Sequence, residues 1–78
     1  MGKVHFHCIY FYDENGVRKT AEYDSPKQSH NIANPNVIAG ILKHEIKKEI
    51  GHTVQGFMAI GKYPVGGEKS WTTVTEGK

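Results

Sequence analysis

Two histidines and one cysteine stand close together in the N-terminal stretch KVHFHCIYFY. His5 and His7 are two residues apart, and alternate residues of a β-strand point to the same side, so both imidazoles could reach one metal ion. Cys8 would point to the other side. The spacing does not choose a third ligand among the remaining candidates, which are His30, His44, His52 and Asp24. We therefore expect no metal or other cofactor, and keep metal binding through His5 and His7 as a second alternative.

Other groups of reactive residues do not match the catalytic patterns that they resemble. The segment HEIKKEIGH lacks the second histidine that a zinc-protease helix needs four residues after the first, because that position is Lys48. In GKYPVGGEKS, Glu68 separates the glycines from Lys69, which breaks the phosphate-loop pattern. Cys8 is expected on the core side, away from any activating base. We therefore expect that the protein is not an enzyme.

Size and composition limit the architecture. A chain of 78 residues can bury only one small core, so residues 1–78 are expected to form a single domain. The net charge of +2 and the scattered lysines do not form a basic patch. One cysteine, no signal peptide and no apolar run long enough for a membrane span favour the cytoplasm.

A β-hairpin is the first element that could position these residues. Val4 to Tyr12 is rich in β-branched and aromatic residues, which favours a first strand. Asn15-Gly16 suits a type I′ turn, and VRKTAEY is expected to form the second strand, antiparallel to the first. The two-residue turn pairs Glu14 with Val17, and the pairing then continues to Cys8 with Tyr23. Alternation along these strands predicts a core face and a second face, and the second face carries His5, His7, Ile9, Phe11 and Arg18.

A helix and two further strands complete the expected fold. Asn34 and Pro35 begin a helix that runs to Ile50 and stops at Gly51. TVQGFMAIGKY then predicts a strand with Val54, Met58 and Ile60 on one face, and with Phe57 and Ala59 on the other. WTTVT is expected to return as a last strand. The fold class is therefore α+β, in the order ββαββ, with an antiparallel sheet and one helix packed on one face.

The second face of the hairpin has three interpretations. The connection Asp24 to Ala33 could cover its apolar residues. Alternatively, the face could bind another protein, because exposed apolar patches on small domains usually mark contacts. Thirdly, it could stack nucleobases, with the helix lysines Lys43, Lys47 and Lys48 contacting phosphates. The predicted binding surface consists of His5, His7, Ile9, Phe11, Arg18 and Phe57.

We expect a small intracellular binding protein of adaptor or inhibitor type, acting by protein-protein contact through a sheet face or a sheet edge. Its size is typical of proteins that phages and mobile elements encode. The partner would be another protein, or a second copy paired along a sheet edge. A nucleic-acid-binding module is the first alternative, ranked below protein binding because acidic residues share the face. No membrane association is expected.

Overall fold

The N-terminal hairpin has the predicted turn and the predicted register. The computed structural model describes residues 2–72, beginning with strands β1 (Val4–Glu14) and β2 (Val17–Asp24). Their register pairs Glu14 with Val17 and continues to Cys8 with Tyr23, as the two-residue turn requires. Asn15 and Gly16 have φ of 54° and 79°, which are the positive values of a type I′ turn. The assignment of β1 and β2 side chains to two faces is therefore confirmed.

One helix, α1 (Pro35–Glu49), forms where the capping residues predicted it. The Asn34 side chain accepts a hydrogen bond from the Asn36 N–H at 2.9 Å, and Pro35 takes the first helical position. At the other end, Gly51 has a φ of 96°, and its N–H donates to the Ile46 carbonyl. This positive φ suits a glycine that ends a helix.

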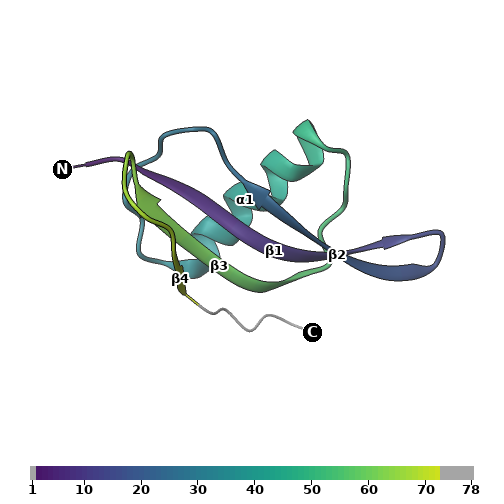
Figure 1. Ribbon diagram of the computed structural model, residues 1–78. Helices are drawn as coiled ribbons and strands as arrows, with labels where there is room; N and C mark the ends of the chain where they lie inside the picture. The colour runs from purple at the N-terminus through teal and green to yellow at the C-terminus, as the bar shows by residue number, and fades with distance from the viewer. Residues whose placement is uncertain (1, 73–78) are drawn as a thin grey trace.

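The sheet is antiparallel and has the order β2-β1-β3-β4, with β3 at Gly56–Pro64 and β4 at Ser70–Thr72. Helix α1 lies across one side of it (Figure 1). The element order ββαββ and the α+β class are confirmed, although residues 73–75 of the predicted last strand lie outside the described residues. The core lies between α1 and the sheet, and its buried members are Val4, Phe6, Cys8, Tyr10, Ile38, Ala39, Leu42, Ile46, Phe57 and Ile60.

A β-bulge in β3 changes the predicted faces of that strand. Ile9 pairs with Ala59, but the next residue, Tyr10, pairs with Phe57, so Met58 has no residue opposite it. Phe57 and Ile60 can therefore both face the core although they are three residues apart. Phe57 is only 2% exposed. Its predicted place on the second face is wrong, because the bulge shifts the alternation of β3 side chains by one residue.

The connection between β2 and α1 runs along the edge of β1. The Ser25 N–H donates to the Phe6 carbonyl at 2.9 Å, and Ser29 exchanges two backbone hydrogen bonds with Val4. Further along, Ile32 packs against the core. The hydrogen bonds of this segment to β1 are at Val4, His5 and Phe6, and none of them is to Ile9 or Phe11. They therefore give no support to the first interpretation of the second face.

Candidate functional site

The candidate site is the face of the sheet that lies away from α1, which we call the open face. Among residues 2–72, no helix covers it (Figure 1). Its members are the second-face residues of β1 and β2, together with the residues of β3 that pair with His5, His7 and Ile9 and the residue of β4 that pairs with Gly61. They are His5, His7, Ile9, Phe11, Asp13, Arg18, Thr20, Glu22, Asp24, Ala59, Gly61, Tyr63 and Trp71. The face divides into a polar, aromatic part near β4 and an apolar part near the hairpin.

His7 lies at the centre of the polar part, but it is buried. It pairs with Asp24 on β2 and with Gly61 on β3, and Gly61 pairs with Trp71 on β4. Because Gly61 has no side chain, the indole of Trp71 reaches His7, and their ring centroids are 3.9 Å apart. His7 is therefore only 2% exposed, beneath Trp71. It supports the predicted surface without being part of it.

The hydrogen bonds of His7 identify its tautomer. Its Nε2 lies 2.8 Å from the Ser70 carbonyl oxygen, which can only accept, so Nε2 carries the proton. Its Nδ1 is buried and has no hydrogen-bond partner among the described residues. This bond holds β4 against the sheet, and with it the Trp71 ring, which remains 45% exposed. The result is an exposed indole on a fixed support.

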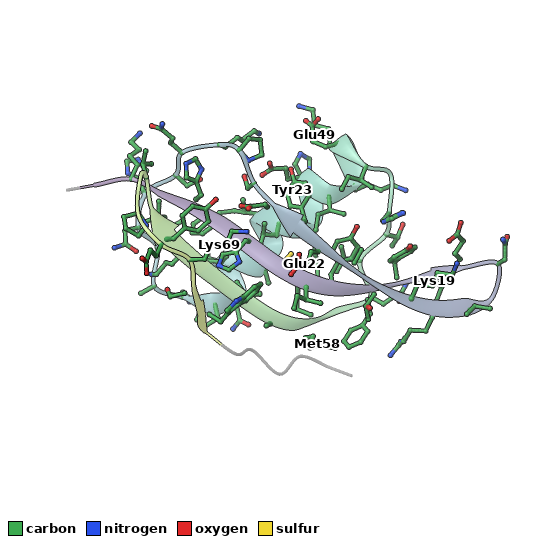
Figure 2. The ribbon with its side chains drawn as sticks, viewed as in Figure 1. Lys19, Glu22, Tyr23, Glu49, Met58 and Lys69 are labelled. Atoms are coloured by element: carbon green, nitrogen blue, oxygen red, sulfur yellow. The ribbon has the colours of Figure 1, made fainter. Side chains whose placement is uncertain are left out.

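Asp24, at the end of β2, connects this strand to β3 and to the segment that precedes β4. Its carboxylate accepts hydrogen bonds from the Tyr63 hydroxyl at 2.8 Å and from Lys69 Nζ at 2.7 Å. Partial burial alone would raise the pKa of Asp24, but these two hydrogen bonds and the Lys69 charge lower it. The hydrogen bond from Tyr63 to Asp24 raises the pKa of Tyr63, and the separate hydrogen bond from Lys69 to Asp24 raises the pKa of Lys69. Figure 2 shows Lys69 beside the β3–β4 end of the sheet.

The apolar part of the open face contains the two residues that the sequence singled out, Ile9 and Phe11. Both are half-buried. The Arg18 guanidinium carbon lies 5.3 Å from the centre of the Phe11 ring, within cation–π range. Met58, at the bulge, is 49% exposed and extends beyond β3, away from α1 (Figure 2). An apolar strip with an arginine at its border therefore continues from the polar part.

The residues predicted for nucleic-acid binding do not form one surface. Lys43, Lys47 and Lys48 are exposed on α1, which packs on the opposite side of the sheet from the aromatic residues. Among residues 2–72, Arg18 and Lys69 are the cations that reach the open face, and each lies beside a carboxylate, Asp13 and Asp24 respectively. The open face thus offers little free positive charge to a phosphate backbone.

The two histidines of the metal hypothesis are held by the backbone. His5 Nδ1 bonds to the Lys27 carbonyl at 2.9 Å, and His7 Nε2 bonds to that of Ser70. In the part of the chain that the structure describes, no group of three histidine, cysteine, aspartate or glutamate side chains is placed to hold a metal ion. Burial raises the pKa of the Cys8 thiol to about 12, which keeps it protonated and unreactive.

Sequence reasoning missed Trp71, Tyr63 and Asp24 as members of one site. Their contact depends on β3 pairing with both β1 and β4, and no local pattern specifies that order. One signal was available: Gly61 and Trp71 are a glycine in a strand and an aromatic residue in the next strand, a combination that permits close packing.

Within residues 2–72, no helix has the length and apolar character needed to span a membrane. Comparisons of the chain with protein-family models, with curated proteins and with solved structures find no match.

Proposed function

We propose that this protein is a small binding protein of adaptor or inhibitor type that contacts another protein through the open face of its sheet. The observation that carries the proposal is the half-exposed Trp71 ring held against buried His7. Tryptophan and methionine are enriched at the centres of protein interfaces, and a ring that is already fixed loses little conformational entropy on binding.

The surroundings of Trp71 fit an interface. Ile9, Phe11 and Met58 supply apolar surface, and polar side chains such as Arg18, Glu22 and Lys69 border it. This arrangement of an apolar centre with a polar rim is the usual anatomy of an interface. The single cysteine, buried as a thiol, fits a reducing compartment, so we propose that the protein acts in the cytoplasm.

The test is affinity isolation from the source cells with quantitative mass spectrometry, comparing the native chain with two variants. Trp71→Ala and Phe11→Ser each remove an apolar group from the open face, and both should lose the same partner. The matched control is Val37→Ser on α1, because Val37 is 45% exposed, as Trp71 is, but lies on the other side of the sheet.

Circular dichroism must first show that all variants fold. A partner retained by Val37→Ser and lost by both open-face variants supports the proposal. Identical partners for all four proteins would refute it. Titration of native protein with single-stranded oligonucleotides at low salt, followed by Trp71 fluorescence, should show no binding; salt-sensitive binding would instead favour the nucleic-acid alternative.

A further inference from the structure

The outer edge of β2 is unpaired among the described residues. β2 is the last strand in the order β2-β1-β3-β4, and the connection that follows it bonds to β1 and not to β2. An unpaired edge presents backbone N–H and C=O groups to which another strand can bond. The hairpin end of β2 projects past the sheet, so this edge is accessible (Figure 1).

The hydrogen-bond pattern determines which groups point outward. The Ser25 N–H bonds to Phe6, and along an antiparallel pair every second residue makes such bonds. Lys19, Ala21 and Tyr23 therefore bond inward to β1. The outward backbone groups belong to Arg18, Thr20 and Glu22.

Arg18, Thr20 and Glu22 can pair with the same three residues of a second copy that runs in the opposite direction. If a second copy approaches antiparallel with its two-fold axis at Thr20, the two threonines face each other. Arg18 of each copy then lies opposite Glu22 of the other, which gives two ion pairs on the open face. Opposite charges at directly facing positions stabilise strand pairing, and like charges destabilise it.

The core side of the edge fits the same register. Val17 is 56% exposed and would lie opposite Tyr23 of the second copy, giving a β-branched residue against an aromatic one. Lys19 would lie opposite Ala21, whose small side chain leaves room for the lysine stem. Figure 2 shows Lys19 near the hairpin end and Glu22 further along the strand.

The neighbouring registers are poorer. An axis at Ala21 would place Arg18 opposite Asp24, which already accepts from Tyr63 and Lys69, and Glu22 opposite Thr20. An axis at Lys19 would place Arg18 opposite Thr20 and Glu22 opposite Gly16, so no charges would pair. Of these three registers, only the axis at Thr20 places Arg18 opposite a carboxylate that pairs with no other side chain among the described residues, that of Glu22. Arg18 itself lies 4.0 Å from Asp13 in its own copy and would gain Glu22 as a second acidic neighbour.

We propose that two copies of this chain associate through their β2 edges, antiparallel about Thr20, to form one continuous sheet with four strands from each copy. The two open faces then lie side by side on the same surface. The dimer uses the β2 edge and not Trp71, so it goes beyond the binding function proposed above and can succeed or fail separately from it.

Analytical ultracentrifugation of the full chain tests this proposal from about 10 µM to about 1 mM, the range in which weak dimers form. The native chain should shift from monomer to dimer. Arg18→Glu and Glu22→Arg each create two repulsive contacts and should raise the dimer Kd at least tenfold. The double variant R18E/E22R restores both pairs with reversed charges and should recover a Kd within about threefold of native.

Amide hydrogen exchange gives a readout of the register. At high concentration the N–H groups of Arg18, Thr20 and Glu22 should gain protection, whereas those of Lys19 and Ala21 should be protected at every concentration. Trp71→Ala serves as the control and should dimerise like the native chain. A native chain that stays monomeric at about 1 mM, single variants as tight as native, or a double variant without recovery would each overturn the proposal.

Discussion

At the scale of single residues, the Asp24 carboxylate makes stability depend on pH. Its folded pKa is lowered, so its ionised form stabilises the fold above its unfolded pKa of about 3.9, and this contribution is lost as pH falls through the folded value. Asp24→Asn should therefore be less stable than native at pH 7, by a small amount because the pair with Lys69 is half-exposed. The difference should narrow at pH 3. Urea unfolding at both pH values measures it, and an unchanged difference would contradict the argument.

Two glycines should respond in opposite ways to a single methyl group. A Cβ at Gly61 would collide with the Ser70 carbonyl and with His7 Nε2, so Gly61→Ala should lower the unfolding free energy by about 1–3 kcal/mol and change Trp71 fluorescence. A Cβ at Gly40, inside α1, meets nothing within 4 Å. Gly40→Ala should therefore raise stability by about 0.5–1 kcal/mol. Chemical denaturation of both variants checks the pair, and equal effects would count against the packing described at His7.

At the scale of the elements, the buried carboxylate of Glu45 connects α1 to the end of β2 through hydrogen bonds. Glu45 is 4% exposed and accepts from the Tyr23 hydroxyl at 2.6 Å and the Ser25 hydroxyl at 2.9 Å. Burial of Tyr23 and its hydrogen bond to Glu45 raise the pKa of Tyr23. Glu45→Ala leaves both hydroxyls without their acceptor and should cost about 1–3 kcal/mol.

The matched control for that change is Glu49→Ala, one turn further along α1 and exposed, which should alter stability by less than about 0.5 kcal/mol. Denaturant midpoints of the two variants make the comparison. Comparable losses would mean that helix propensity, and not the buried network, explains the effect.

The sequence predicted those elements whose ends carry strong local signals. Asn15-Gly16 determined the hairpin register because both residues tolerate positive φ, and Asn34, Pro35 and Gly51 bounded the helix to within one residue. The faces of β3 were predicted incorrectly because a bulge interrupts alternation at Met58. Phe57 and Ile60, two large apolar residues at an odd spacing, were a signal for that bulge. Nothing local could place Trp71 over His7, because that contact joins residues 64 positions apart, on two strands that are separated by β3.

At the scale of the whole molecule, the long hairpin makes the shape elongated, with principal extents of 43 × 23 × 19 Å. Much of its outer strand is exposed, so self-association would bury surface that the monomer leaves open. If the β2 edges pair, the melting temperature of the native chain should rise with protein concentration, because mass action stabilises the folded dimer. Arg18→Glu should show little such dependence. Thermal scans over a hundredfold concentration range measure it, and a constant melting temperature for the native chain would argue against pairing.

The bulge at Met58 also has a genetic consequence. Removing one codon inside a strand normally transfers every following side chain to the opposite side of the sheet. Here, losing Met58 would leave Phe57, Ile60 and Gly61 on their present sides, since the strand would simply become regular. Losing Ile60, by contrast, would move Gly61 and the residues after it to the opposite side of the sheet. An in-frame deletion scan through this strand should therefore find one tolerated codon, at the position where the strand already holds one residue more than its partner.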